Sequence, residues 1–348
     1  MSRWAVVLAG GVGSRFWPLS TPERPKQLLP LVTDKPLLYD TVQRLSTIVD
    51  PAHTLILTSV SLIKPIRKLL GNIPRENILA EPQPVGTAAA LTWAALSIAQ
   101  RDGEEATMLC VHADWAIGDD VVFRETLLRA EEVAIETHSL VTVGIVPTRP
   151  DPGFGYIQPS ESDTGRPSRV KRFVEKPNRA KAEEMRNNGY LWNSGIFVWR
   201  VGDFLNEVDE HTPELAAALR EGRTGDPEAS RFFGSVVMPV SVDVGVLERT
   251  NKVVVVPGDF GWDDIGTWAA LSRVRSKDEF GNVTSGDSHL LDCADNVVHA
   301  DSGMVVMYGV NDLVVVTRNG LTLVTTTERA SDLKRLVDSL SVSSPEKL

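Results

Sequence analysis

Short apolar runs alternate with segments of helical spacing through the first half of the chain. The apolar runs are rich in β-branched residues and predict strands at residues 4–9, 53–59, 78–81, 106–111 and 140–146. Between them, apolar residues recur at helical spacing and predict helices at residues 37–49, 61–70, 87–101 and 121–137. This alternation is typical of an α/β fold, in which helices cover a parallel sheet.

The pattern changes twice in the second half of the chain. From about residue 150 it is mixed, with strands predicted at residues 155–158, 169–174 and 195–200 and helices at residues 179–188 and 201–219. From about Asp278, short Val-rich runs are separated by Gly, Asn and Asp turns, and helical spacing returns only at residues 330–340. We therefore predict an α/β domain over residues 1–277 and a small all-β domain over residues 278–348, a sandwich or a short solenoid closed by an amphipathic helix.

Composition and charge narrow the classes of partner. The chain of 348 residues is 42% hydrophobic and 24% charged, which is ordinary for a globular protein, and its formal net charge is −10. This balance argues against general nucleic-acid binding, which needs a basic surface. Cys110 and Cys293 are too few for a disulfide framework, and neither a signal peptide nor an apolar run of membrane-spanning length is evident. We expect a cytoplasmic protein that binds neither nucleic acid nor membranes.

The first predicted strand runs directly into a glycine-rich turn. Gly10, Gly11 and Gly13 lack the Cβ that would keep the backbone away from a phosphate, so successive N–H groups can converge on an anion. Arg15 and Lys26 follow and can neutralise a polyphosphate. The turn lacks the GK[ST] ending of a P-loop, and Arg15 stands near where the last glycine of a dinucleotide fingerprint belongs. The alternative is a tight turn that binds no ligand, but glycines and cations together favour phosphate binding.

Carboxylates stand where three of the predicted strands end. Asp114 follows the fourth strand and is placed for a ligand crevice; alternatively, it caps the next segment. Glu81 ends the third strand and can accept the two adjacent N–H donors of guanine, the alternative being a surface glutamate. Glu175 and Lys176 precede Pro177, which ends a strand and fixes the point where both charges emerge. An exposed ion pair is the alternative for these two residues.

A series of motifs in this order resembles that of the sugar-1-phosphate nucleotidyltransferases. The motifs are GGVGSRFWPLS with RPKQLLPL, then FVEKP, WNSGIFVW, SVDVGVLERT and GWDDIGTW. The later ones narrow the resemblance to the mannose-1-phosphate guanylyltransferases, and the match runs from residue 3 to about residue 340. It implies a Rossmann-like nucleotidyltransferase domain with a mixed sheet, followed by a small domain that resembles a left-handed β-helix. Family analogy implies that this small domain contributes to contact in a homodimer.

The resemblance also implies roles for particular side chains. Asp114 and Asp264 would bind Mg²⁺, for which carboxylates are suitable hard ligands, whereas Asp263 would stand outside the metal site. Arg15 and Lys26 are the expected catalytic residues. Nucleotide binding is expected of Leu8, Ala9, Gly10, Gly11, Gly13, Glu81, Gly86 and Thr87. Sugar-phosphate binding is expected of Gly155, Glu175, Lys176 and Asn193.

The chain departs from the family pattern at two places. Trp115 stands where the family has a histidine after the metal-binding aspartate. The segment PVGTAAA lacks the Arg and Asn of relatives, which leaves Gly86 and Thr87 as the matched positions, and Thr87 can alternatively cap its helix. A further residue, Asp243, matches a family position near the active site, where it would orient a lysine, either Lys26 or Lys176.

The expected reaction is transfer of GMP from GTP to mannose 1-phosphate, which gives GDP-mannose and pyrophosphate by in-line attack at the α-phosphorus. Because the attacking oxygen is already anionic, catalysis needs positioning and charge stabilisation more than a strong base. Two alternatives stay open: another GDP- or NDP-sugar pyrophosphorylase, for example one that makes GDP-heptose, and a catalytically silent regulatory homologue that binds a sugar nucleotide. A Rossmann dehydrogenase is disfavoured because the glycine pattern is wrong and metal-binding carboxylates have no use there.

Overall fold

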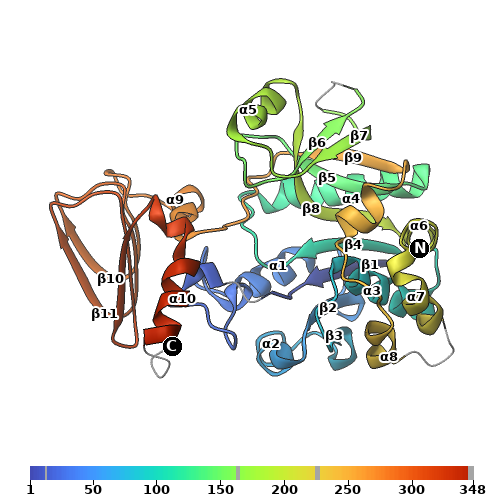
Figure 1. Cartoon of the computed structure of the whole chain (residues 1–348), viewed down its shortest axis with the longest axis horizontal. Helices are drawn as coiled ribbons and strands as arrows, with labels where there is room; N and C mark the ends of the chain where they lie inside the picture. Colours follow the sequence, from blue (N-terminus) through green and yellow to red (C-terminus); the bar gives the residue numbers. More distant parts are fainter. Residues whose placement is uncertain (12–13, 162–164, 224–227, 344–348) are drawn as a thin grey trace. The chain divides into compact units, whose positions relative to one another are not determined.

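The computed structural model describes residues 1–11, 14–161, 165–223 and 228–343, which form two compact units (Figure 1). Unit 1 consists of Met1–Gly10, Val42–His112 and Asp119–Trp262, and unit 2 consists of Gly11–Thr41, Ala113–Gly118 and Asp263–Leu348. Each unit thus combines segments that are distant in the sequence. The predicted domains divide the chain at a single point between residues 277 and 278, and that boundary stays a prediction.

A mixed sheet forms the centre of unit 1. Its strands are β1 (Arg3–Leu8), β2 (Thr54–Ser59), β3 (Ile78–Glu81), β4 (Thr107–His112), β5 (Leu140–Ile145), β6 (Tyr156–Pro159), β7 (Ser168–Val174), β8 (Leu191–Arg200) and β9 (Val253–Gly258). Among the described residues their order is β3-β2-β1-β4-β8-β5-β9-β7-β6. β1 is parallel to β2 and β4, whereas β8 is antiparallel to β4 and β5. The predicted mixed sheet is therefore confirmed.

Helices pack on both faces of this sheet. They are α2 (Ile63–Leu69), α3 (Thr87–Asp102), α4 (Asp120–Thr137), α5 (Arg179–Asn187), α6 (Val201–His211), α7 (Ala216–Gly222) and α8 (Ala229–Gly234), with short turns η3 (Pro51–His53), η4 (Val60–Leu62), η5 (Arg75–Asn77), η6 (Pro213–Leu215) and the π-helical η7 (Asp243–Leu247). α3, which is rich in alanine, and α6 pack in one apolar core with Phe197 and Trp199 of β8. Alternate side chains of a strand point to opposite faces of the sheet, so helices can pack on either face. α4 packs on β5, β8 and β9 (Figure 1). Among the residues described, none of the helices combines the length and apolar character that crossing a membrane requires.

Two features of unit 1 differ from the pattern-based prediction. The helix predicted over residues 201–219 is broken between α6 and α7, because Pro213 has no N–H for a helical hydrogen bond. No strand is predicted from the pattern at β9, yet this strand lies between β5 and β7 and its valines are buried. A short, fully buried apolar run has no alternation, so periodicity alone does not identify it as a strand.

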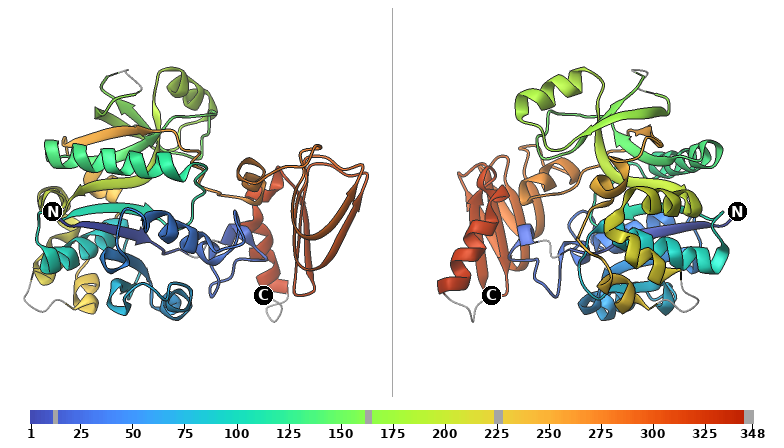
Figure 2. Two further views of the ribbon diagram at one scale, coloured as in Figure 1. Left: turned by 180° about the vertical axis from the view of Figure 1, so that it is seen from behind. Right: turned by 45° about the vertical axis from the view of Figure 1, so that its right-hand side comes forward.

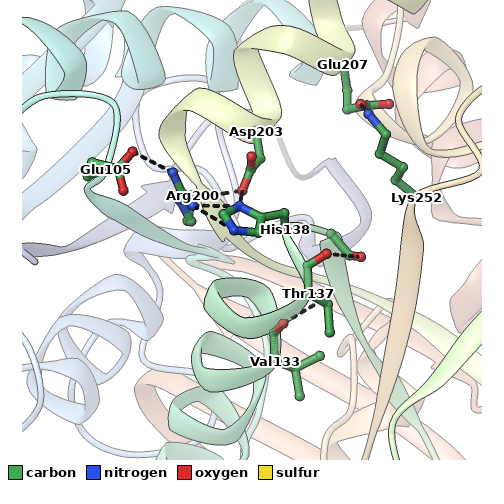
Figure 3. Close-up of polar contacts among 9 residues, drawn as sticks. Glu105, Val133, Thr137, His138, Arg200, Asp203, Glu207 and Lys252 are labelled. Atoms are coloured by element: carbon green, nitrogen blue, oxygen red, sulfur yellow. Dashed lines mark hydrogen bonds and ion pairs between the residues drawn. The ribbon is translucent and has the colours of Figure 1, made fainter.

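A polar network fixes the end of β8, where α6 begins (Figure 3). Arg200 donates to Glu105 Oε1 over 2.6 Å, and its Nη1 lies 2.6 Å from Nδ1 of His138, the residue that follows α4. Asp203, in the first turn of α6, lies 3.6 Å from Arg200 Nε and 3.4 Å from His138 Nδ1. The network therefore links β8 with the ends of two helices.

Unit 2 combines early segments of the chain with a second sheet. Its elements are β10 (Val283–Leu291), β11 (Val297–Tyr308), β12 (Leu313–Arg318), β13 (Leu321–Thr326), η1 (Ser14–Phe16), η2 (Lys26–Leu28), η8 (Trp268–Ala270), α9 (Leu271–Val274), η9 (Arg329–Ser331) and α10 (Leu333–Ser343), while α1 (Leu37–Leu45) is shared by both units. β10, β11 and β12 are parallel neighbours, and β13 pairs antiparallel with β12. Phe16, Trp268 and Val314 share one core with Leu333 of α10, which lies alongside these strands in Figure 2.

Candidate active site

Lys26 stands between two aspartate-bearing segments of unit 2. It opens η2 directly after Pro25, which has extended backbone geometry with φ of −69°. The Lys26 Nζ donates to Asp114 Oδ2 over 3.0 Å and to the carbonyl oxygen of Asp264 over 2.6 Å. Only 10% of the Lys26 side chain is exposed, against 36% of the Asp114 side chain. The ammonium group thus brings the predicted catalytic lysine together with both predicted metal-binding residues.

The two adjacent aspartates of GWDDIGTW differ in their contacts. The Asp263 carboxylate accepts two hydrogen bonds from Arg273, over 2.7 and 2.9 Å, and one from the Ile265 N–H over 2.9 Å. Its backbone exchanges two hydrogen bonds with Ala116, over 2.9 and 3.1 Å, which joins this turn to the segment that carries Asp114. Asp263 thus holds the turn in place, and these contacts support its expected position outside the metal site.

Asp264 and Arg15 converge at Gly266. An ideal Cβ at Gly266 would lie 3.0 Å from Asp264 Oδ2 and 3.2 Å from Arg15 Nη1. The absence of a side chain at position 266 therefore leaves room for both charged groups. We name Arg15, Lys26, Asp114 and Asp264 the Lys26 cluster, because contacts within unit 2 bring these predicted residues together.

The Lys26 cluster has a donor set that fits a hard divalent cation. Burial has the largest effect on the pKa of Asp264 and raises it, while the Lys26 ammonium is the strongest of the influences that lower it. No group of three or more His, Cys, Asp or Glu that could hold a metal occurs in the part of the chain that the structure describes. Mg²⁺ usually takes one or two protein carboxylates and completes its shell with phosphate oxygens and water. Asp114 and Asp264 therefore fit Mg²⁺ bound together with a phosphate compound, not a closed protein cage.

The glycine-rich turn begins where β1 ends. Leu8 and Ala9 are buried, with 8% and 1% exposed, and the Ala9 N–H donates to Leu57 O of β2. Gly10 and Gly11 are exposed, and Gly11 has φ of +94°, a conformation that favours glycine. Gly13 lies outside the described residues. The sheet thus anchors the first part of this predicted phosphate-binding turn and leaves its glycine backbone accessible.

Glu81 ends β3 with its carboxylate toward Gly10. An ideal Cβ at Gly10 would lie 3.9 Å from Glu81 Oε1. Burial raises the pKa of Glu81 to about 7, so this side chain changes its charge in the neutral pH range. A half-buried carboxylate beside a glycine turn has the acceptor pair that the guanine edge requires.

Gly86 and Thr87 pack against residues 240–242. Gly86 has φ of +94°, and an ideal Cβ there would lie 2.2 Å from Val240 O, so this position requires glycine. The Val242 N–H donates to Thr87 Oγ1 over 3.0 Å. The alternative that Thr87 caps α3 is wrong, because Gly86 occupies the N-cap position and the Thr87 hydroxyl accepts the Val242 N–H instead. Nucleotide binding by Gly86 and Thr87 stays a prediction.

A small pocket in unit 1 gathers residues predicted to bind the sugar phosphate. We name it the Asn193 pocket, and it is lined by Gly155, Tyr156, Phe173, Val174, Glu175, Asn193, Asp243 and Glu248. The Asn193 N–H donates to Gly155 O over 2.8 Å, and an ideal Cβ at Gly155 would lie 2.9 Å from Glu175 Oε2. Lys176 is exposed, and its Nζ donates to Glu175 Oε1 over 2.6 Å. Glycine at position 155 therefore lets Glu175 and Asn193 share one pocket.

Two carboxylates of this pocket come from the motif SVDVGVLE. Asp243 accepts a hydrogen bond from Asn193 Nδ2 over 2.8 Å, so its partner is an amide and not the lysine that the sequence suggested. Burial raises the pKa of Asp243, and the hydrogen bond from Asn193 opposes this effect. Sequence reasoning missed Glu248, because a glutamate near a surface turn is ordinary. Its place five residues after Asp243 in a family-like motif was the only signal for it.

Two family models match the chain. The model described as Nucleotidyl transferase matches residues 4–280. The model described as MannoseP isomerase/GMP-like beta-helix domain matches residues 286–340, which contain most of β10 together with β11, β12 and β13. The predicted fold, a nucleotidyltransferase domain followed by a small β-helix-like domain, is thereby confirmed.

Individual relatives lead to the same family. A mannose-1-phosphate guanylyltransferase of Klebsiella pneumoniae is 37% identical over 354 residues, which cover 96% of this chain and 73% of that protein. The alginate biosynthesis protein AlgA of Pseudomonas aeruginosa is 35% identical, with coverage of 96% and 71%. A crystal structure from Thermus thermophilus, described as a mannose-1-phosphate geranyltransferase, matches with a TM-score of 0.91 at 35% identity and covers 98% of this chain and 100% of that one. The chain therefore belongs to the nucleotidyltransferase family and, within it, to the mannose-1-phosphate guanylyltransferases.

Proposed function

We propose that this protein transfers GMP from GTP to mannose 1-phosphate and releases pyrophosphate, with Mg²⁺ as its cation. Family membership supports sugar-phosphate nucleotidyl transfer as the reaction. The observation that carries the proposal is the Lys26 cluster, in which a buried ammonium lies 3.0 Å from Asp114 Oδ2 and contacts the backbone of Asp264. Such a group offers a fixed cation for phosphate oxygens beside two carboxylates for a metal.

The proposed reaction needs little proton transfer. An anionic oxygen of mannose 1-phosphate attacks the α-phosphorus of GTP and forms a new P–O bond. The bond from the α-phosphorus to the oxygen that bridges to the β-phosphate breaks, and its electron pair leaves with pyrophosphate. Mg²⁺ held by Asp114 and Asp264 would supply charge neutralisation on the phosphate oxygens. Arg15 and Lys26 neutralise the charge that develops on the α-phosphate and on the leaving pyrophosphate.

Residues of unit 1 provide recognition in this proposal. Glu175 and Asn193 exchange hydrogen bonds with sugar hydroxyls in the Asn193 pocket, and Lys176 pairs with the sugar phosphate. Glu81 accepts the two adjacent N–H donors of guanine. A uracil or thymine edge offers one donor between two acceptors and suits a carboxylate less well. Base preference therefore rests on Glu81, and sugar preference rests on the Asn193 pocket.

A substrate panel tests the proposal. The full chain, with Mg²⁺, is given GTP, ATP, UTP, CTP or dTTP together with mannose, glucose or heptose 1-phosphate, and pyrophosphate release is measured. We expect GTP with mannose 1-phosphate to give the highest kcat/KM by at least about tenfold, and we expect chelation of the metal to abolish activity. A higher kcat/KM for another pair would replace this assignment with another NDP-sugar pyrophosphorylase. The absence of pyrophosphate with every pair would indicate a silent homologue that binds sugar nucleotides.

A further inference from the structure

One segment of unit 1, residues 240–250, contacts both the start of α3 and the Asn193 pocket. At its beginning, Val242 N–H donates to Thr87 Oγ1 over 3.0 Å, and Ala88 N–H donates to Val240 O over 3.3 Å. The next residue, Asp243, accepts the hydrogen bond from Asn193 Nδ2. A continuous set of contacts thus leads from the start of α3 to the pocket.

Asp243 determines how the Asn193 amide is oriented. Asp243 accepts through its Oδ1, so Asn193 turns its Nδ2 toward Asp243, 2.8 Å away. The other end of the amide, Oδ1, accepts the Gly195 N–H over 3.2 Å. Both contacts require the same orientation of the amide. The second N–H and the remaining lone pair of Asn193 are therefore offered to a ligand in one arrangement.

Thr87 fixes the backbone from which Asp243 projects. Val242 is only 1% exposed, so its N–H depends on a protein acceptor, and Thr87 Oγ1 provides one. The backbone of the segment also approaches Gly86 closely, since an ideal Cβ there would lie 2.2 Å from Val240 O. A valine at position 87 would keep nearly the same shape but would leave the Val242 N–H without its partner.

Other contacts hold the far end of the segment and its continuation independently of Thr87. The Thr212 hydroxyl donates to Gly245 O over 2.8 Å. Glu207 of α6 lies 2.6 Å from Lys252 Nζ, a contact drawn in Figure 3. Loss of the single hydrogen bond at Thr87 should therefore alter the placement of Asp243 without unfolding the segment.

We propose that Thr87 and Asp243 are positioning residues for the sugar phosphate. Thr87 fixes the backbone that carries Asp243, and Asp243 orients the Asn193 amide toward the sugar. The proposal rests on the proposed function only in taking the Asn193 pocket as the sugar-phosphate site. It gives Thr87 an effect on the sugar phosphate, whereas the sequence predicts Thr87 to bind the nucleotide.

Steady-state kinetics with both substrates varied independently test the role of Thr87. The substrate pair is the best one from the panel above, so a different substrate assignment leaves this test intact. Thr87→Val should raise the KM for the sugar 1-phosphate about five- to tenfold, the effect of one lost hydrogen bond, and leave the KM for the nucleotide within about twofold. Thr87→Ser keeps the acceptor and should restore the wild-type values. An increase in the nucleotide KM alone, or no rescue by Thr87→Ser, would overturn the proposal.

Thr92→Val is the matched control for Thr87→Val. Thr92 lies in the same helix, is buried, and donates its hydroxyl to Ala88 O within α3 over 2.7 Å. The substitution is the same, but the hydrogen bond that it removes lies within the helix, so both KM values should stay within about twofold of wild type. If Thr92→Val raised the KM for the sugar 1-phosphate as much as Thr87→Val, the effect would reflect helix stability and not positioning.

A double-mutant cycle tests whether Asp243 acts through Asn193. Asp243→Asn is nearly isosteric but introduces a donor, so the Asn193 amide loses its fixed orientation, and the KM for the sugar 1-phosphate should rise about tenfold. In the Asn193→Ala background the same change should add less than about twofold. An equal effect in both backgrounds would overturn the proposal.

Binding measurements separate this proposal from the proposed function. Circular dichroism and thermal melting first establish that each variant is folded, and Asp243→Asn decides the question if Thr87→Val does not fold. The same variants are then compared by calorimetric titration with the sugar 1-phosphate alone. A chain without turnover would refute the proposed function, while the order of affinities across the variants would still decide this proposal. Equal affinity in wild type and Asp243→Asn would overturn it.

Discussion

At the residue scale, one buried and one half-buried side chain are central to the proposed reaction. Lys26 donates hydrogen bonds to Asp114 and to the Asp264 carbonyl, so its Nζ has protein acceptors although the side chain is buried. Burial raises the pKa of the Glu81 carboxyl to about 7. The charge of Glu81 therefore responds to pH near neutrality.

Binding of the guanine nucleotide is expected to depend on pH through Glu81. Because the raised pKa of Glu81 is about 7, the carboxyl is protonated below this pH and no longer accepts both guanine donors. The KM for GTP should therefore rise as the pH falls, by up to about tenfold per pH unit well below the pKa. Glu81→Gln, which does not titrate, should show a high KM for GTP without this component. An identical pH profile in wild type and Glu81→Gln would contradict the role of Glu81.

At the element scale, contacts outside the reacting groups hold the turn that presents Asp264. Arg273 of α9 donates two hydrogen bonds to Asp263, and Asp263 forms a two-bond bridge with Ala116. These contacts join α9 to the segment that carries Asp114. The geometry of the Lys26 cluster therefore depends on a salt bridge that performs no chemistry.

Removal of this salt bridge should lower stability. Asp263 is 5% exposed, and Arg273→Met removes the guanidinium that pairs with this buried carboxylate, so the free energy of unfolding should fall by about 2–3 kcal/mol. Asp263→Asn, added to Arg273→Met, should recover part of this loss, because it removes the buried negative charge with which Arg273 pairs. Urea unfolding measures both effects, with the exposed Arg329→Met as the control. Equal unfolding midpoints for Arg273→Met and wild type would contradict this account.

The local pattern of apolar and polar residues predicts a helix or strand correctly where the sequence of that segment alone distinguishes the two. Strands such as β2 and β4 are recognisable because short, mostly apolar runs are bounded by polar segments. The break at Pro213 was foreseeable from its missing N–H, but the apolar spacing continues across it and favours one helix. β9 was not predicted, because a run of valines is compatible with a buried strand and with a buried helix alike.

The site was predictable in its residue types more than in its pairings. Asp114 follows one predicted strand and Glu81 ends another, and parallel sheets bind ligands at the carboxyl ends of their strands. The local sequence therefore predicts both the chemistry and the position of these two residues. Asn193 and Asp243 are 50 residues apart, and no local pattern specifies that their side chains meet. Glu248 carries no signal beyond its motif. Tertiary packing, not sequence spacing, assembles the Asn193 pocket.

At the scale of the whole molecule, the position of a residue along the chain does not determine the unit to which it belongs. Arg15 and Lys26 lie near the N-terminus but belong to unit 2, together with the C-terminal sheet. A shared apolar core that includes Phe16, Trp268 and Val314 accounts for this grouping. The Lys26 cluster thus belongs wholly to unit 2, whereas Glu81, Lys176 and the Asn193 pocket belong to unit 1.

In the proposed reaction, the Lys26 cluster carries out nucleotidyl transfer. The sharpest test of this role is an assay with GTP and Mg²⁺ that compares wild type with Lys26→Met. The assay measures the release of pyrophosphate that depends on mannose 1-phosphate. The exposed Lys64→Met serves as the control. We expect wild type and Lys64→Met to turn over alike, and we expect the kcat of Lys26→Met to fall about 10²–10³-fold, the loss typical of removing one group that stabilises transition-state charge. Binding of mannose 1-phosphate should persist in this variant. A kcat for Lys26→Met within about threefold of wild type would contradict the account.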